Sequence, residues 1–319
     1  MRISLRCVVL GLVIGLIATG RSELCADTAD VLRKIDPQVL PEKNTLRSMV
    51  GDNLRQRRSE ANRRSTTEWH GVQSFEDWTR LRDAKLALLR KSLGQPIEAP
   101  ADLHVETVGT LAGDGFSIER IVFESRPGLL VTANLYVPAE QTKPMPGILI
   151  CHSHHNPKTE GELQDMGMLW ARQGCSVLVM DQLGHGERRQ HPFRTADDYP
   201  EKFRVSRQDY FFRYNVGQQL HLVGESLIGW MAWDLMRGVD LLLKRPGVDP
   251  DRIILLGAVA GGGDPAAVTA SLDPRIAAAV PFNFGGPQPE TQFPLPENAE
   301  DRFNYAGGGS WESTRNLRL

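Results

Sequence analysis

The second half of the chain alternates between short apolar runs and segments with the pattern of helices. Residues 147–151, 175–181 and 253–257 are almost continuously apolar, which is typical of strands buried on both faces of a parallel sheet. Residues 161–173 and 218–244 separate these runs and are predicted helices, the second with a single apolar stripe. This order of strands and helices predicts a mostly parallel sheet covered on both faces.

An antiparallel hairpin is predicted before this parallel part. Residues 116–124 and 129–137 each alternate apolar and polar positions, and Arg126-Pro127-Gly128 between them is a turn signal. After the last buried run, residues 265–272 predict a helix and residues 276–282 predict a final strand. The fold class is therefore α/β, with an antiparallel N-terminal hairpin.

The N-terminal part of the chain differs from the rest in composition. Residues 27–100 are polar and rich in arginine, and they predict a helical segment in front of an α/β domain at 101–319. Within that segment, residues 75–93 have apolar positions at helical spacing, and Gly94 is a natural stop. Residues 1–26 are predicted to form a signal peptide.

The signal peptide has the usual three parts. Arg2 and Arg6 give a positive start, residues 7–18 form an apolar core, and small residues follow, so cleavage after Gly20 or Ala26 is expected. The apolar core is too short for a comfortable membrane span. We expect a secreted or periplasmic protein that leaves the membrane after signal removal, with an N-terminal anchor as the alternative.

Charge and cysteine content narrow the functional classes. The 319 residues carry a formal net charge of -2, which gives no reason to expect a nucleic-acid partner. The arginines between 55 and 64 indicate either a solvated helix face or an anionic partner. Cys151 and Cys175 lie near opposite ends of neighbouring predicted strands, with an offset of roughly 13 Å, so we expect no disulfide between them.

The third apolar run ends in a glycine-rich turn. Its sequence, Gly257-Ala258-Val259-Ala260-Gly261, has the spacing of the Gly-x-Ser-x-Gly nucleophile elbow, and Gly262 and Gly263 follow. The glycines suit a place where strand and helix nearly touch, because a Cβ there would clash. Val259 occupies the nucleophile position and has no oxygen. We expect it at positive φ, a strained conformation for a β-branched residue.

Polar residues gather at the ends of the predicted parallel strands. Ligands of such sheets bind outside the carboxyl ends of the strands, so residues 152–155, residues 181–186 and Val259 should surround one crevice. Asp181 ends a strand at this crevice, where it could act as a general base. Residues 210–214 would either contact a substrate or pack against the domain.

Five segments of the chain resemble the acetyl-xylan-esterase-like branch of the α/β-hydrolase superfamily. They are Phe123 to Gly128, Ala133 to Pro138, Asp181 to Gly186, Asp234 to Asp240 and Val248 to Ile253. The resemblance implies a serine hydrolase of carbohydrate or small-acid esters with a Ser–acid–His triad and no cofactor.

The resemblance also implies roles for individual residues. Backbone N–H groups of Ala260 and of the loop at Ser153 and His154 would form the oxyanion hole. The elbow glycines would be Gly257, Gly261 and Gly262. The pocket candidates are His152, His155, Asp181, His185, Tyr210 and Phe212. For Asp181 the resemblance also implies an alternative to a general base, in which its carboxylate shapes the loop by accepting backbone N–H groups.

Two departures from the family pattern predict a chain without triad catalysis. Val259 replaces the serine, and no histidine follows His221, although the triad order places the histidine last. The chain ends about where the family's last two strands would begin, so we expect a C-terminally incomplete domain. The strand at 276–282 should then be an apolar edge.

Two alternative functions remain open from sequence. The first is a non-enzymatic module that keeps the crevice for binding. The second is a metal-dependent hydrolase that uses the loop from His152 to His155, where only His152 and His154 match the spacing of a known metal-binding loop. We expect no metal. The oligomeric state is left open.

Overall fold

The structure is a computed structural model that describes residues 30–31, 33–34, 43–94, 102–141, 143–153, 157–190 and 208–282. The predicted signal peptide at 1–26 lies outside these residues. The chain divides into two compact units, Met1–Ala61 and Asn62–Leu319, and helix α2 (Lys43–His70) crosses that boundary. Among the helices that are described, none is long and apolar enough to cross a membrane.

The second unit is built on a seven-stranded sheet, in the order β1-β2-β3-β5-β4-β6-β7. Strands β1 to β3 form an antiparallel meander, and β3 also pairs antiparallel with β5. Strands β5, β4, β6 and β7 run parallel to one another. The strands are β1 (Glu106–Gly113), β2 (Phe116–Arg126), β3 (Leu129–Pro138), β4 (Met145–Cys151), β5 (Ser176–Met180), β6 (Val248–Ala258) and β7 (Ile276–Phe282).

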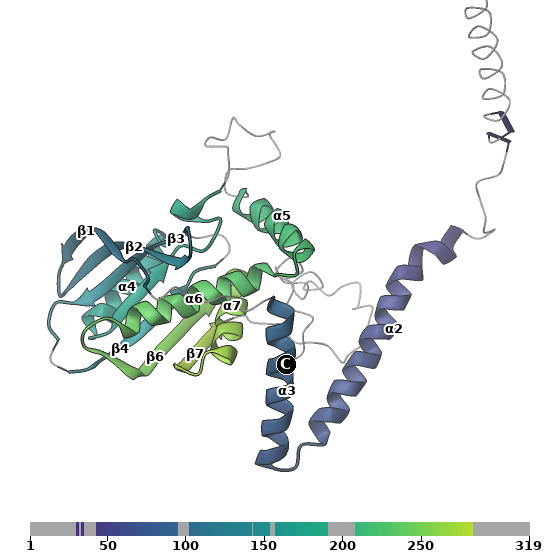
Figure 1. The fold of residues 1–319 in the computed structure, drawn as a ribbon, viewed down its shortest axis with the longest axis horizontal. Coiled ribbons are helices and arrows are strands. Elements are labelled where there is room, and N and C mark those ends of the chain that lie inside the picture. Colours follow the sequence, from purple (N-terminus) through teal and green to yellow (C-terminus); the bar gives the residue numbers. More distant parts are fainter. Residues whose placement is uncertain are drawn as a thin grey trace, which may run out of the picture. The chain divides into compact units, whose positions relative to one another are not determined.

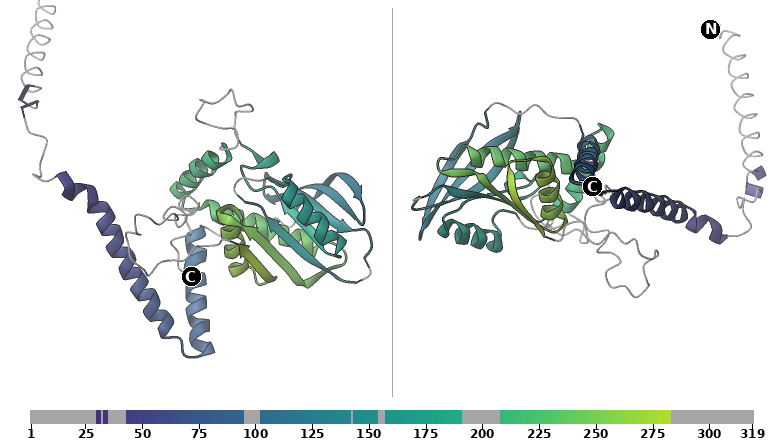
Figure 2. Two further views of the ribbon diagram at one scale, coloured as in Figure 1. Left: turned by 180° about the vertical axis from the view of Figure 1, so that it is seen from behind. Right: turned by 90° about the horizontal axis from the view of Figure 1, so that it is seen from below.

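Helices cover both faces of this sheet, as the sequence predicts (Figures 1 and 2). Successive side chains of a strand point to opposite faces. Leu149 accordingly lies in a core with α6 (Leu227–Leu243) and α7 (Val259–Leu272), whereas Ile148 lies in a core with α4 (Gly161–Arg172). The parallel strands are thus buried between two apolar layers, which explains their continuous hydrophobic runs.

Several sequence predictions are confirmed at residue level. The hairpin of β2 and β3 turns at Gly128, whose φ of 77° is a conformation that glycine adopts without strain. Helix α3 (Phe75–Leu93) ends at Gly94, which also has positive φ. Strand β1 could not be predicted from sequence, because this edge strand exposes most of its residues and lacks a regular alternation.

The single helix predicted for 218–244 is wrong. The structure has two helices there, α5 (Gln208–Leu222) and α6, with a break between them. Gly224 adopts φ 77°, and the hydroxyl of Ser226 caps α6 by accepting a hydrogen bond from the Gly229 N–H at 3.2 Å. A serine N-cap marks the start of a new helix. This signal was missed because the apolar pattern continues on both sides of it. Val223 is 69% exposed and does not belong to a buried stripe.

Helix α3 packs against the α/β part, although the sequence assigned it to a separate N-terminal segment. Leu89 of α3 is buried with Ile228 and Ala232 of α6 and Val268 of α7. The Leu93 carbonyl accepts a hydrogen bond from the Ser226 hydroxyl at 3.0 Å. The C-terminal half of α3 therefore belongs to the core of the second unit.

Cys151 and Cys175 are buried and form no disulfide, as predicted. Cys151 pairs with Met180 across the two strands, five residues beyond Cys175. That register places the two cysteines about 16 Å apart along the strand direction, well beyond the reach of a disulfide.

Strand β7 is an edge of the sheet among the described residues. Val280 and Phe282 are 54% and 66% exposed, so the edge is also apolar. The prediction of an apolar edge strand at 276–282 is confirmed. Such an edge offers unpaired backbone groups and hydrophobic side chains to another chain.

Because this edge is apolar, we expect the chain to self-associate through β7. Sedimentation velocity should show association that increases with concentration and that the double substitution Val280→Lys, Phe282→Lys suppresses. The matched control is Leu130→Lys, since Leu130 is similarly exposed at 58% on another strand. A wild-type chain that stays monomeric at all concentrations would contradict this expectation.

The beginning of α7 lies against the ends of β4 and β6 through two glycines. A Cβ on Gly257 would be 2.2 Å from the Gly262 carbonyl oxygen, and a Cβ on Gly262 would be 2.5 Å from the Cys151 carbonyl oxygen. These neighbours are backbone atoms, which cannot move aside cheaply. The predicted close approach of strand and helix at Gly257 and Gly262 is confirmed.

The substitution Gly257→Ala should therefore destabilise the fold by at least the roughly 1–3 kcal/mol that overpacking costs. Urea denaturation of the full chain measures this loss. Gly161→Ala is the matched control, because Gly161 opens α4 and a Cβ there meets no atom within 4 Å. The control should be neutral or slightly stabilising, and equal stability of the two variants would disprove the close contact.

Candidate functional site

The polar residues singled out from sequence lie at one edge of the sheet. Cys151, the last residue of β4, pairs with Met180 on one side and with Gly257 on the other. The three parallel strands therefore end side by side. The segments that follow them start at His152, at Asp181 and at the first turn of α7, which forms the frame of the expected crevice.

Helix α7 begins directly after the strand, as in a nucleophile elbow. Ala258 is the N-cap, with extended φ of −124° and ψ of 146°, and no side chain caps the helix. The first N–H groups of a helix have no partner within it, and they lie at the positive end of the helix dipole. The N–H of Ala260 belongs to this turn, so the turn offers a backbone hydrogen-bond donor to an oxyanion.

Val259 is the first residue of α7, at the position that the spacing assigns to the nucleophile. The side chains of Val259 and Ala260 lie outside the described residues. The positive φ expected for Val259 stays a prediction. Gly261 lies two residues further, and its carbonyl accepts a hydrogen bond from the Cys151 thiol at 3.9 Å.

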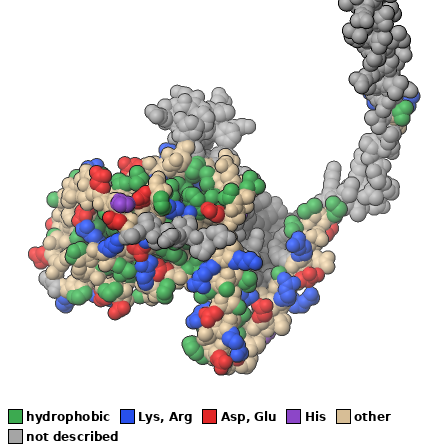
Figure 3. Space-filling model, viewed as in Figure 1, with side chains coloured by type: hydrophobic (Ala, Val, Ile, Leu, Met, Phe, Trp, Pro, Cys, Tyr) green, Lys and Arg blue, Asp and Glu red, His purple; other side chains and the backbone are tan. Residues whose placement is uncertain are grey.

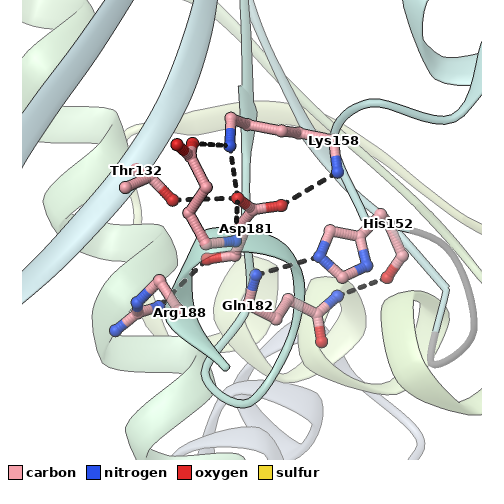
Figure 4. Close-up of polar contacts among 7 residues, drawn as sticks. Thr132, His152, Lys158, Asp181, Gln182 and Arg188 are labelled. Carbon is pink, nitrogen blue, oxygen red and sulfur yellow. Dashed lines mark hydrogen bonds and ion pairs between the residues drawn. The ribbon is translucent and has the colours of Figure 1, made fainter. Parts of the chain in front are cut away.

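Asp181 is a fully buried acceptor that fixes the surrounding loops (Figure 4). Its carboxylate accepts the backbone N–H groups of Lys158 at 3.0 Å and Glu187 at 3.2 Å, and the hydroxyl of Thr132 at 2.8 Å. A Cβ on Gly186 would lie 2.3 Å from the same carboxylate. With its lone pairs engaged in this way, Asp181 shapes its loop and is not placed to act as a general base.

A buried lysine and a buried arginine complete this network. The ammonium of Lys158 is paired with Asp181 and, at 2.5 Å, with Glu187. The guanidinium of Arg188 donates to the Asp181 carbonyl at 3.0 Å and to Asp234 of α6 at 2.8 Å. Each buried charge thus has an opposite charge beside it, as burial demands. The network ties the loop after β4 to the loop after β5 and to α6.

Both ring nitrogens of His152 are engaged. Nε2 accepts the Gln182 N–H at 2.9 Å, and Nδ1 lies 2.6 Å from the Ser153 carbonyl, which assigns the proton to Nδ1. Burial lowers the pKa of His152 to about 4, because a charged ring would be poorly solvated there. His152 is therefore a neutral, structural histidine, with no nitrogen left for a metal or for proton transfer.

Gln182 and Arg213 hold the same corner, although the sequence singled out neither within the segments 181–186 and 210–214. The Gln182 amide donates to the Cys151 sulfur at 3.1 Å and to the His152 carbonyl, and its oxygen accepts from Arg213 of α5. Arg213 is completely buried. A glutamine after a strand and an arginine in an aromatic helix carry no signal in sequence, since only the fold brings them together.

The remaining candidates fall into two groups. His185 is buried edge-to-face against His152 at 5.1 Å between ring centroids, and Phe212 packs over Gly184 in a satellite core of α5 and α6. In this first group, His185 and Phe212 are thus held by packing against their neighbours. Ser153 is half-buried at the loop. His154, His155 and the side chain of Tyr210 lie outside the described residues.

The hydrogen bonds of His152 argue against the metal-site hypothesis, because His152 was its first expected ligand. His152 would have to give up the hydrogen bond of one ring nitrogen to bind a cation. In the part of the chain that the structure describes, no group of three His, Cys, Asp or Glu side chains could hold a metal ion.

The buried His152 should make stability depend on pH. Its pKa is about 4 when folded and near 6.5 when unfolded, so its contribution is complete above pH 6.5 and disappears as the pH falls toward 4. This single group should account for a loss of about 3 kcal/mol across that window. Urea denaturation between pH 7 and pH 4 measures it.

The variant His152→Gln should lose that part of the pH dependence, because glutamine does not titrate. His221→Gln, at an exposed histidine of α5, is the control and should keep the wild-type slope. Identical slopes for His152→Gln and the wild type would show that His152 is not buried in its neutral form.

Solved structures with a similar fold include esterases. A Bacteroides fragilis protein described as a candidate acetyl xylan esterase matches with a TM-score of 0.52 and 18% identity, over 64% of this chain and 53% of its own. The methylesterase BT1017 matches with a TM-score of 0.50 and 19% identity, over 66% of this chain and 42% of its own. The chain thus spans about half the length of these proteins or less. No curated protein sequence matches it.

The family model of acetyl xylan esterase (AXE1) matches residues 75–284. The match begins at the first residue of α3 and ends just after β7, so it includes the elbow and both loops of the polar network. It also includes α3, in agreement with the packing of that helix against α6 and α7. This chain, with its α/β-hydrolase fold, belongs to the acetyl xylan esterase family.

Proposed function

We propose that this chain is an exported protein that binds esters of carbohydrates or small acids in the crevice and does not hydrolyse them by a serine triad. One observation carries the proposal. Val259 stands at the elbow position, and a valine has neither a nucleophilic oxygen nor a proton to lose.

The frame that would bind an ester supports the binding part of the proposal. The glycine contacts that fix the elbow are intact at Gly257 and Gly262, and the uncapped first turn of α7 offers N–H groups to a carbonyl oxygen. The family match and the fold make an ester the expected ligand. An acetylated sugar would fit a site of this class.

The polar residues nearest the elbow support the absence of triad chemistry. His152 uses both nitrogens in hydrogen bonds, and the Asp181 carboxylate is engaged by several donors. Neither could activate a nucleophile without dismantling the corner that it holds. The same contacts argue against the metal-dependent alternative.

The catalytic part of the proposal is tested by turnover of p-nitrophenyl acetate. We expect the wild type and Val259→Ala to give the same rate, because neither residue can be acylated, and mass spectrometry should detect no acyl-enzyme. If the wild type is faster than Val259→Ala and the substitution Ser153→Ala removes this activity, the nucleophile lies in the loop after β4 and the proposal is overturned.

The binding part is tested by calorimetry with an acetylated xylo-oligosaccharide. We expect Val259→Trp, which fills the crevice, to abolish binding, whereas Val259→Ala retains it. Unfolding curves of both variants serve as the check that the fold is kept. Equal affinity of Val259→Trp and the wild type would place the ligand elsewhere.

A further inference from the structure

Three aromatic side chains are exposed at the turn between α2 and α3. Trp69 is 57% exposed near the end of α2, and Phe75 and Trp78 are 80% and 39% exposed in the first turn of α3. The rings of Trp69 and Trp78 meet edge-to-face, with centroids 6.0 Å apart and planes at 89°. Aromatic side chains of this size normally contribute to a core.

Polar contacts also hold the turn, beside the edge-to-face contact of Trp69 and Trp78. Ser74 caps α3 by accepting the Asp77 N–H at 3.1 Å, and Lys85 of α3 pairs with Glu68 of α2 at 2.5 Å. Phe75, with four-fifths of its surface in solvent, contributes little to packing. Burying a phenylalanine would stabilise the fold by roughly 1.5–3 kcal/mol, so the exposure of Phe75 does not serve the stability of the fold.

The surroundings of the rings favour a small ligand with both apolar and polar surface. Exposed charged and amide side chains surround the aromatic group on both helices, and Figure 3 shows charged side chains of both signs over α2 and α3. A stable protein interface needs about 800 Å² on each partner with an apolar centre, which is more than three separate rings provide. The exposed polar neighbours are Glu68, Gln73, Glu76, Arg80 and Arg82.

A pyranose ring has the matching chemistry. Its C–H groups carry partial positive charge and stack on the negative face of an aromatic ring, while its hydroxyls point outward to carboxylate, amide and guanidinium groups. Each aromatic ring, with its hydrogen-bonding neighbours, would contact one sugar unit. Several such contacts would follow one another along a polysaccharide.

We propose that Trp69, Phe75 and Trp78 form a carbohydrate-binding platform, distinct from the ester crevice, that holds a polysaccharide chain by stacking. The choice of xylan as the polymer rests on the proposed function, whereas the aromatic platform itself does not.

Binding of deacetylated xylohexaose to the full chain tests the platform, because this ligand has no ester for the crevice. Calorimetry should show that Trp69→Ala, Trp78→Ala and Phe75→Ala each weaken binding about three- to tenfold. Trp170→Ala is the matched control, because Trp170 of α4 is also 39% exposed and should have no effect. Phe75→Ala keeps the test valid if a tryptophan variant loses the helical hairpin.

The outcomes separate this platform from the crevice. If xylohexaose binds equally to the wild type and to all three variants, or fails to bind at all, the platform is wrong. If the acetylated oligosaccharide still binds in that case, and Val259→Trp abolishes its binding, the proposed function holds without the platform. Concentration-dependent dimerisation that Trp69→Ala and Phe75→Ala abolish would assign the aromatic group to a contact between copies of the chain, and would also overturn the proposal.

Discussion

The site depends on the backbone contact between the first turn of α7 and the ends of β4 and β6. Gly257 and Gly262 leave no space for a Cβ, because carbonyl oxygens of the neighbouring segments stand within 2.5 Å of where it would be. This contact fixes where strand becomes helix, and hence the location of Val259 and of the first N–H groups of α7. It requires nothing of residue 259 itself. The frame of an elbow can therefore form in a chain with a valine at the nucleophile position, which is consistent with the proposed binding of an ester carbonyl.

A second constraint is the burial of charge beside that contact. Asp181, Lys158 and Arg188 lie almost wholly out of solvent, and each is stabilised only because its partners are also in place. Burying such groups singly would cost several kcal/mol, so the network stabilises the corner as a unit. The burial of this corner also lowers the pKa of His152, which here indicates a structural role for the residue. A shifted pKa in a crevice often marks a catalytic group, but here hydrogen bonds occupy both nitrogens.

The proposed functions assign two different chemistries to one unit of the chain. In these proposals the first turn of α7 donates its N–H groups to a carbonyl oxygen, whereas the exposed rings between α2 and α3 stack on a sugar ring. A polymer that carries esters on a sugar backbone presents both kinds of group. Two weak contacts with one chain can raise the overall affinity beyond either contact alone, provided that the polymer reaches both sites.

The sequence by itself determined the strands of the parallel sheet, the hairpin, the elbow and its missing serine. These features have local causes, since continuous apolar runs need burial on two faces and glycine spacing reflects one tight turn. It also indicated that Asp181 could shape its loop. The sequence did not separate α5 from α6, because the apolar pattern continues across the break at Gly224. It included Gln182 and Arg213 only as members of longer candidate segments, and it did not include Lys158. Their roles arise from pairing between segments 23 to 31 residues apart in the chain, so only the tertiary structure decided them.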